Sequence, residues 1–157
     1  MTAANARRTA TQTPAVDKVD ASYLESLLGY NARRAALAVI EVFLERMAVY
    51  GLRPVDFSVL SLIGHNPGIT SRQLCTTLGI LPPNLVGMIN ALEKRELIVR
   101  RPHPHDGRAM GLHLTQSGQK LMRDAERTAT RLETEVADRL SAAEARTLIR
   151  LLKKIYL

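Results

Sequence analysis

Apolar residues recur every three or four positions through most of the chain and predict a mainly α-helical protein. The first such stretch covers residues 22–50 and is followed by Gly51, which predicts one long helix with a glycine at its end. A second apolar stripe, formed by Leu37, Ile40 and Leu44, lies roughly opposite the first. We expect a helix that is apolar on two sides to be shared between a domain core and a subunit interface; burial in one larger core is the alternative.

Three shorter helices are predicted next, over residues 54–65, 72–78 and 82–94. An Asn-Pro-Gly turn at 66–68 separates the first two, Thr70 or Ser71 can cap the second, and Gly79 ends it. Two short helices joined by a tight glycine turn form a helix-turn-helix, although the same pattern occurs in bundles that never bind DNA. Val59, Leu60 and Ile63 are expected to face inward, and the apolar positions of the next two helices are Leu74, Leu78, Val86, Ile89 and Leu92.

A β-hairpin is predicted after these helices. Residues 97–101 and 110–114 are β-prone, and the basic, proline-containing stretch 102–108 between them is typical of a hairpin tip. A helix-turn-helix followed by a hairpin is a winged helix, in which the second helix enters the major groove of DNA while the tip reaches the neighbouring minor groove or backbone.

Two further helices are predicted at the C-terminal end. The first begins at the Thr-Gln-Ser-Gly run 115–118, and Ser141 with Glu144 forms a capping box for the second. The predicted fold class is therefore mainly α with a small β-hairpin wing. Its expected parts are a flexible N-terminal arm (1–21) and a domain (22–157) in which dimerisation helices (22–53 and 116–157) flank the winged helix-turn-helix (54–115).

Composition agrees with a helical fold and places the positive charge in the middle of the chain. Apolar residues make up 46% of the 157 residues but aromatic residues only 4%, which suits helices better than a β-sandwich. The net charge is +7, and residues 70–120 alone hold seven basic and three acidic residues, a net +4. A nucleic-acid partner would explain this distribution, and an arginine-rich solvated surface explains it equally well.

The sequence has no motif for catalysis, a cofactor or membrane insertion. It has no phosphate-binding glycine loop, nucleophile elbow or paired metal-ligand motif, so we expect neither an enzyme nor a bound cofactor. His103, His105 and Asp106 resemble a metal cluster, but we expect them to form the wing tip. No apolar run approaches the ~18 residues of a membrane span, and no signal peptide is evident, which predicts a cytoplasmic protein without a membrane partner. Cys75 is interpreted as a packed side chain, with a redox sensor as the alternative.

The run LxxxxLIVRRPHPHDGR, which ends at Arg108, and the following LHLTQSG carry a family resemblance. Together with the order of the helices over residues 22–157, they resemble the MarR (multiple antibiotic resistance regulator) family. Asp106 and Arg108 match the wing pair of that family. The resemblance implies a homodimer that binds a palindromic operator and represses until a small aromatic or phenolic ligand weakens binding. Relatives often have Ser or Thr and Arg in the recognition helix, whereas this chain has Pro83, Asn84, Val86 and Gly87.

The candidate DNA-binding residues come from the predicted helix-turn-helix and wing. They are Ser71, Arg72, Gln73, Pro83, Asn84, Gly87, Asn90, Arg101, His105, Asp106 and Arg108. The amides of Asn84 and Asn90 can each pair with an adenine edge, although polar residues on an exposed helix face are ordinary. The start of the helix at residues 71–73 suits a phosphate or is a simple N-cap. Arg108 is expected to follow the minor groove, oriented by Asp106.

The resemblance places an effector pocket between the dimerisation helices and the DNA-binding domain. Tyr30 and Arg34, one helical turn apart, together with His65 would offer a cation and hydrogen-bond donors to an aromatic acid or aromatic acyl thioester. Arg34 as an interfacial ion-pair partner and His65 as a satisfied helix-end residue are equally open. The predicted function is a ligand-responsive, DNA-binding transcriptional regulator; the alternative is a winged-helix protein-interaction module that does not bind DNA.

Overall fold

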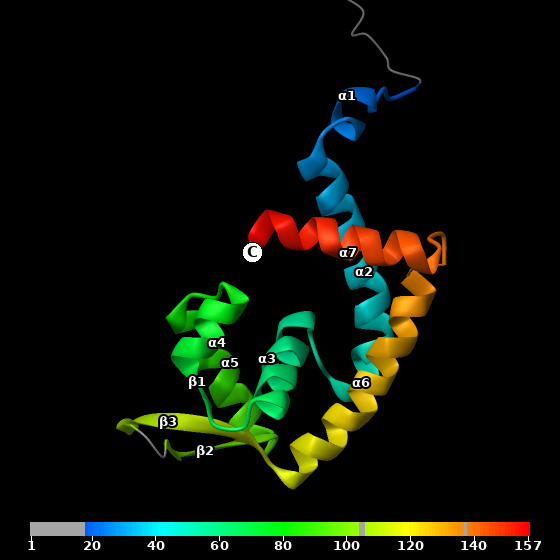
Figure 1. The fold of residues 1–157 in the computed structure, drawn as a ribbon. Helices are drawn as coiled ribbons and strands as arrows, with labels where there is room; N and C mark the ends of the chain where they lie inside the picture. Colours follow the sequence, from blue (N-terminus) through cyan, green and yellow to red (C-terminus); the bar gives the residue numbers. More distant parts are fainter. Residues whose placement is uncertain (1–17, 104–105, 137) are drawn as a thin grey trace, which may run out of the picture. The chain divides into compact units, whose positions relative to one another are not determined.

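The computed structural model describes residues 18–103, 106–136 and 138–157 (Figure 1). In chain order, the elements are α1 (Ser22–Glu25), α2 (Leu28–Met47), the 3-10 helix η1 (Ala48–Tyr50), α3 (Pro54–His65), β1 (Ile69–Thr70), α4 (Ser71–Leu78), α5 (Pro82–Lys94), β2 (Ile98–His103), β3 (Asp106–Leu114), α6 (Gln116–Val136) and α7 (Ala142–Tyr156). The chain forms two compact units, Met1–Ala35 and Ala36–Leu157, and the boundary between them falls within α2. The expected fold class, mainly helical with a small antiparallel sheet, is confirmed.

The single helix predicted over residues 22–50 is wrong at its start, because α1 and α2 are separate. The Ser26 hydroxyl donates to the carbonyl oxygen of Tyr23 at 2.7 Å, and the Asn31 amide donates to the carbonyl oxygens of Glu25 and Leu27 at 2.7 and 2.8 Å. Short polar side chains that bond to nearby carbonyl groups compete with the helical backbone pattern. The apolar periodicity continues through this break and therefore could not reveal it.

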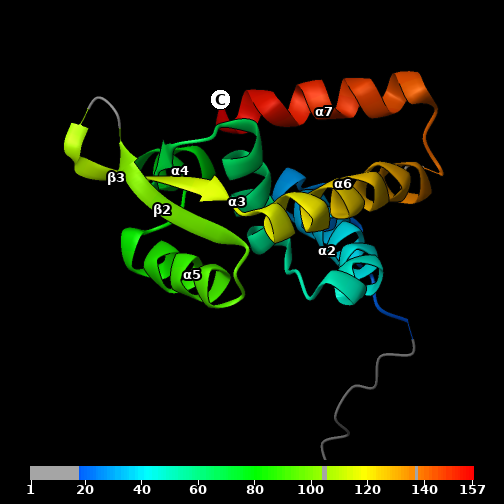
Figure 2. The same ribbon diagram turned by 90° about the horizontal axis from the view of Figure 1, so that it is seen from below.

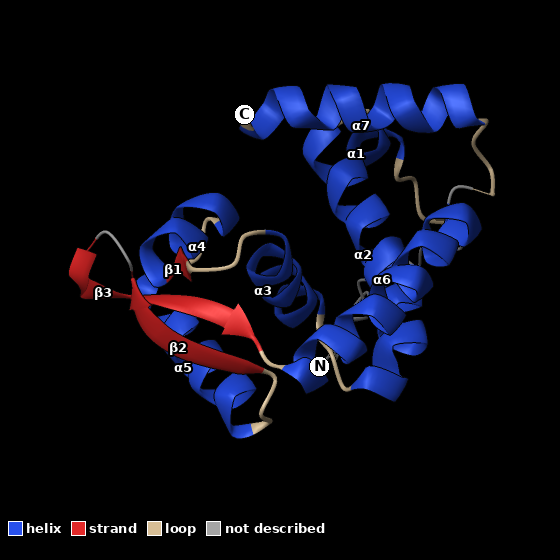
Figure 3. Cartoon of the chain, turned by 60° about the horizontal axis from the view of Figure 1, so that its bottom comes forward, coloured by secondary structure: helices blue, strands red, loops and turns tan. Residues whose placement is uncertain are grey.

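The predicted hairpin is present, and a third strand joins it. The sheet has the order β1-β3-β2 with antiparallel pairing throughout, and it lies beside α3, α4 and α5 (Figure 3). In the register, Ile69 pairs with Leu112, which in turn pairs with Arg100. With only two residues, β1 is too short to have a periodic signature, and the sequence analysis missed it.

The core of the second unit is formed mainly by side chains of α3, α4, α5 and the sheet, together with the end of α2. Its fully buried large side chains are Met47, Val59, Leu60, Ile63, Leu74, Leu85, Ile89, Leu92 and Leu112. Val86, an apolar residue of the predicted recognition helix, is 54% exposed. The buried face of α5 is formed by Leu85, Ile89 and Leu92, at positions i, i+4 and i+7, and Val86 lies about 100° around the helix from Leu85.

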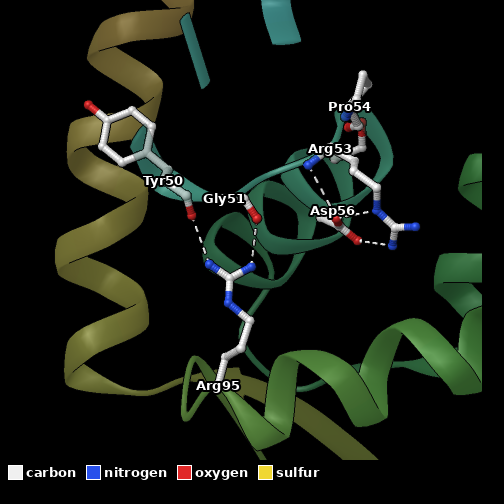
Figure 4. A network of polar contacts seen from close by, with 7 residues as sticks. Tyr50, Gly51, Arg53, Pro54, Asp56 and Arg95 are labelled. Carbon is white, nitrogen blue, oxygen red and sulfur yellow. Dashed lines mark hydrogen bonds and ion pairs between the residues drawn. The ribbon is translucent and has the colours of Figure 1, made fainter. Parts of the chain in front are cut away.

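A network of polar contacts fixes the loop between η1 and α3 (Figure 4). The guanidinium of Arg95, directly after α5, donates to the carbonyl oxygens of Gly51 at 2.9 Å and Tyr50 at 2.8 Å. At the start of α3, the buried Asp56 carboxylate accepts hydrogen bonds from Arg53 Nε at 2.7 Å, Nη2 at 2.8 Å and the backbone N–H at 3.2 Å. Burial alone would raise the pKa of Asp56, but these bonds hold it below its ordinary value of 3.8. The loop is thus tied both to α3 and to the end of α5.

The Leu-Thr-x-x-Gly run forms the junction between the hairpin and α6. Thr115 Oγ1 accepts the backbone N–H of Gly118 at 3.0 Å, as an N-cap does. The hydroxyls of Thr115 and Ser117 both donate to the carbonyl oxygen of Glu96, at 2.6 and 2.7 Å. Glu96 has a positive φ of 56°. The run therefore holds a tight turn of the backbone against the first turn of α6 (Figure 2).

The predicted capping box of α7 is confirmed, since Ser141 Oγ accepts from the Glu144 N–H at 3.3 Å and the Glu144 carboxylate accepts from the Ser141 N–H at 2.8 Å. No side chain of α7 is buried in the single chain.

Among the described residues, no single helix is long and apolar enough to cross a membrane; α4 and α5 reach that length and hydropathy only as a pair bent by 117°.

Candidate nucleic-acid interface

The outer face of α5 carries the residues predicted to meet the bases. Leu85, Ile89 and Leu92 anchor the inner face of the helix in the core. The predicted contact residues on the other side, all exposed, are Pro83, Asn84, Gly87 and Asn90. A Cβ added at Gly87 would meet no atom within 4 Å, so no contact within the chain requires a glycine there. These four residues thus form an uncharged surface in which Gly87 leaves a gap between two amide side chains.

The start of α4 is capped by Thr70 and not by Ser71. The backbone N–H of Gln73 donates to Thr70 Oγ1 at 3.3 Å, and Gln73 Oε1 accepts the Thr70 N–H at 2.9 Å. Gln73 therefore takes part in a capping box, which is one of the two roles considered for it. Ser71 and Arg72 remain exposed at the first turn.

Two shallow hollows separate α4, α5 and the wing. The first, about 300 Å³, is lined by Thr70, Ser71, Arg72, Val86, Ile89, Arg100, Ala109, Met110 and Leu112. The second, about 370 Å³, is lined by Ser71, Arg72, Cys75, Thr76, Pro82, Leu85 and Val86. Arg72 and Val86 line both hollows, so a cation and an exposed apolar side chain lie next to each other at this surface.

A cluster of polar side chains joins α5 to the wing. Arg100 on β2 places Nη2 2.7 Å from Oδ1 of Asn90 and 3.0 Å from Oε2 of Glu93, both on α5. Arg100 was not among the functional residues predicted from the sequence. The run of basic residues at positions 100 and 101 was visible, but the partner of each arginine depends on how β2 packs against α5.

The wing residues are only partly described. Arg101 is exposed on β2, and the pairing of the strands becomes irregular between Pro102 and His103. Asp106 and Arg108 belong to β3, but their side chains lie outside the described residues, as does all of His105. The expected contact between Asp106 and Arg108 therefore stays a prediction.

The predicted ligand residues belong to the two different compact units. Tyr30 and Arg34 lie one turn apart on α2, within the first unit. His65 lies at the end of α3, where its Nε2 is 3.0 Å from Oε1 of Glu126 on α6. The same carboxylate oxygen accepts a hydrogen bond from Ser61 at 3.3 Å. His65 thus has the satisfied helix-end role that was its alternative, and a shared pocket with Tyr30 and Arg34 stays a prediction.

A further hollow and the arrangement of possible metal ligands concern the binding of a small molecule or an ion. A hollow of about 600 Å³, lined by Leu62, Asn66, Pro67, Gly68, Ile69, Gln73 and Thr77, was not predicted from the sequence. Within the described part of the chain, no group of three His, Cys, Asp or Glu side chains could hold a metal ion. Cys75 is partly buried and packs against the core, in agreement with its interpretation as a packed side chain.

A helix-turn-helix followed by an antiparallel wing, with a polar helix face and an arginine-lined hollow beside it, defines the winged-helix class of proteins. The model of the MarR family matches residues 50–109. A protein of Thauera aromatica, assigned to transcriptional regulation of the hcr operon, is 33% identical over 130 residues, which are 82% of this chain and 78% of that protein. The chain belongs to the MarR family.

Solved structures of a transcriptional repressor agree with this assignment. CouR bound to a 23-mer DNA duplex has a TM-score of 0.84 and 39% identity, and the match covers 90% of this chain and 100% of that one. CouR bound to p-coumaroyl-CoA has a TM-score of 0.78 and 40% identity over 88% of this chain and 97% of that one. These relatives are regulators of transcription.

Proposed function

We propose that this chain is a transcriptional repressor that binds a palindromic operator as a homodimer and is released by an aromatic acid or an aromatic acyl thioester. The proposal rests on the exposed face of α5, which lies next to Arg72 and the wing. It is supported by the 39% identity of this chain to a repressor whose structure was solved on a DNA duplex. In this arrangement α5 enters the major groove, the start of α4 faces a phosphate, and the wing tip reaches the minor groove. The net charge of +4 over residues 70–120 favours that approach.

Exposed apolar side chains support the homodimer. On α7, the exposed large apolar residues are Leu148, Ile149, Leu151, Leu152, Ile155 and Tyr156. A 15-residue helix without buried side chains is marginal in water, so it needs a partner surface to be stable. On α2, Leu37, Ile40 and Leu44 are 39–49% exposed as well. A second copy of the chain is the occupant that a palindromic operator requires.

The effector class rests on the bound thioester in the related CouR structure and on the residue types at the predicted pocket. Arg34 offers a cation to a carboxylate or phosphate, and Tyr30 and His65 offer hydrogen bonds and aromatic surface. The effector lowers DNA affinity if it binds more tightly to a conformation in which the two α5 helices no longer match successive major grooves.

Fluorescence anisotropy tests this proposal. We expect a labelled duplex from the region upstream of the gene to bind the full chain, with an affinity that falls steeply as salt is raised. Adding p-coumaroyl-CoA should release the duplex, whereas free coenzyme A should not. Absence of salt-dependent duplex binding would contradict the DNA-binding proposal and favour the protein-interaction alternative. DNA binding that neither p-coumaroyl-CoA nor a panel of aromatic acids weakens would contradict the effector class alone.

A further inference from the structure

The contact between Arg100 and Asn90 restricts what Asn90 can offer to DNA. The terminal Nη2 of Arg100 is 2.7 Å from the amide oxygen of Asn90 and 3.0 Å from the carboxylate of Glu93. One NH₂ group of a guanidinium has two hydrogens, and both have an acceptor here. Since Asn90 and Glu93 are three residues apart on α5, they form one acceptor pair on that helix, which the arginine reaches from β2.

A guanidinium donates hydrogen bonds but cannot accept them, so the atom of the Asn90 amide that faces Arg100 is the oxygen. The amide nitrogen, a donor with two hydrogens, therefore lies on the other side of the same planar group. Asn90 is exposed and shares the outer face of α5 with Gly87. The side chain can thus present its NH₂ group to DNA, while its oxygen is engaged within the protein.

We propose that Arg100 fixes the orientation of the Asn90 amide, with its oxygen toward Arg100 and its NH₂ group toward DNA, so that Asn90 selects guanine over adenine in the major groove. This inference rests on the proposed function and adds a base preference to it. Arg100 is a positioning residue, and Asn90 is the specificity-determining residue.

The preference follows from the edges of the bases. In the major groove guanine presents two acceptors, N7 and O6, whereas adenine presents one acceptor, N7, and one donor, the N6 amino group. A free asparagine amide pairs with both adenine groups because it has a donor and an acceptor. When Arg100 holds the oxygen away from the base, the NH₂ group can donate to both N7 and O6 of guanine, whereas on adenine it finds only N7 and meets the N6 amino group donor to donor. The expectation from the sequence, that Asn90 pairs with adenine, is therefore replaced.

The charge of the cluster favours positioning over direct phosphate binding by Arg100. Its ion pair with Glu93 offsets its charge, and the two side chains are only 39% and 34% exposed. Arg101, the next residue of β2, points to the other face of the strand and is a matched control, because its substitution removes the same charge without freeing Asn90.

The experiment is selection of bound sequences from a pool of random duplexes with the purified full-length chain. Asn90→Ala locates the base pair that Asn90 contacts, because only that position should lose its preference. The parent chain should prefer guanine there by roughly tenfold over adenine, as expected for a good side chain–base contact. Arg100→Met should bring guanine and adenine to within about twofold at this base pair, because the amide can then turn. Arg101→Met should weaken binding to all sequences but leave this preference in place.

Asn90→Asp is a second variant that keeps an oxygen facing Arg100 and replaces the NH₂ group by a second oxygen. It should remain folded and lose the guanine preference. The proposal is overturned if the parent chain prefers adenine at this position, if Asn90→Ala changes no position, or if Arg100→Met weakens binding without changing the base preference. Failure of the proposed function looks different, since the parent chain would then enrich no sequence and show no salt-dependent binding.

Discussion

Gly118, in the first turn of α6, packs directly on the backbone of Leu97: a Cβ added at Gly118 would lie 2.0 Å from the carbonyl oxygen of Leu97. Real Cβ atoms do not come so close to a backbone oxygen, so any larger residue must push the turn after α5 away from α6. The glycine of the Leu-Thr-x-x-Gly run is thus required by packing and not by an unusual φ angle.

We expect Gly118→Ala to lower the free energy of unfolding by about 1–3 kcal/mol, because overpacking here moves backbone and not a flexible side chain. Urea unfolding followed by circular dichroism measures the change. Ser117→Ala is the neighbouring control; it removes one hydroxyl donor to Glu96 but adds no atom, and it should destabilise the chain less. Equal stability of Gly118→Ala and the parent chain would show that the turn can relax freely.

Gly87→Ala should change stability and DNA binding in opposite directions. A Cβ at Gly87 has open space around it, and alanine favours a helix interior over glycine by about 0.5–1 kcal/mol, so the variant should melt at a higher temperature. If DNA approaches this face closely, the added methyl group should weaken duplex binding by about 1–3 kcal/mol. Thermal melting and anisotropy titration test the two effects. A variant that is stabilised and binds DNA as well as the parent would contradict close approach at Gly87.

Protonation of Asp56 should account for part of the decrease in the free energy of unfolding in acid. The hydrogen bonds from Arg53 hold the folded-state pKa of Asp56 below 3.8, so its stabilising contribution is present above that pH and is lost as pH falls through the lowered pKa. Asp56→Ala should lower the free energy of unfolding at pH 7 by about 1–2 kcal/mol, because the N–H of Arg53 loses its capping partner. Urea unfolding at pH 7 and below pH 4 checks this. The difference between variant and parent should shrink in acid, and a constant difference would contradict the role of ionised Asp56.

The homodimer proposal predicts that the apolar stripe of α7 controls assembly. Replacing Leu152 by Glu should raise the dimer dissociation constant by at least about tenfold, because full burial of a leucine is worth about 1.5–3 kcal/mol. Arg150→Glu, on the opposite face of the same helix, should leave the dimer intact. Sedimentation equilibrium measures both. A parent chain that is a folded monomer at micromolar concentration, yet binds its duplex fully, would contradict the proposal.

Replacing either residue of the wing pair, Arg108 or Asp106, by alanine should weaken DNA binding, although the two residues carry opposite charges. Arg108→Ala should weaken operator binding by about 1–3 kcal/mol through loss of a minor-groove contact. Asp106→Ala should weaken it by a smaller amount, although it removes a negative charge near phosphates, because Asp106 is proposed to orient Arg108. Anisotropy titrations at one salt concentration compare the variants. Tighter binding by Asp106→Ala would show that simple charge repulsion dominates and that Asp106 has no orienting role.

Local patterns of the sequence were sufficient for most of the helical framework. The bounds of α3 and α5, the glycine end of α4 and the capping box of α7 depend on residues within one or two turns of each other, and all were predicted. The break between α1 and α2 was missed, although it too is local, because Ser26 and Asn31 form it through side-chain hydrogen bonds that leave the apolar pattern unchanged.

The sequence by itself determined the order of α3, α4, α5, the hairpin, α6 and α7, the class of fold and the exposed face of α5, since these follow from periodicity and short-range capping. Only the tertiary structure decided which side chains meet across elements. Arg100 reaches Asn90 over ten positions of the chain, and Gly118 meets Leu97 over twenty-one. A two-residue strand such as β1 exists only because β3 is there to pair with it. The direction of a strand and the packing of its side chains against a helix depend on the whole core, and therefore no local pattern can encode them.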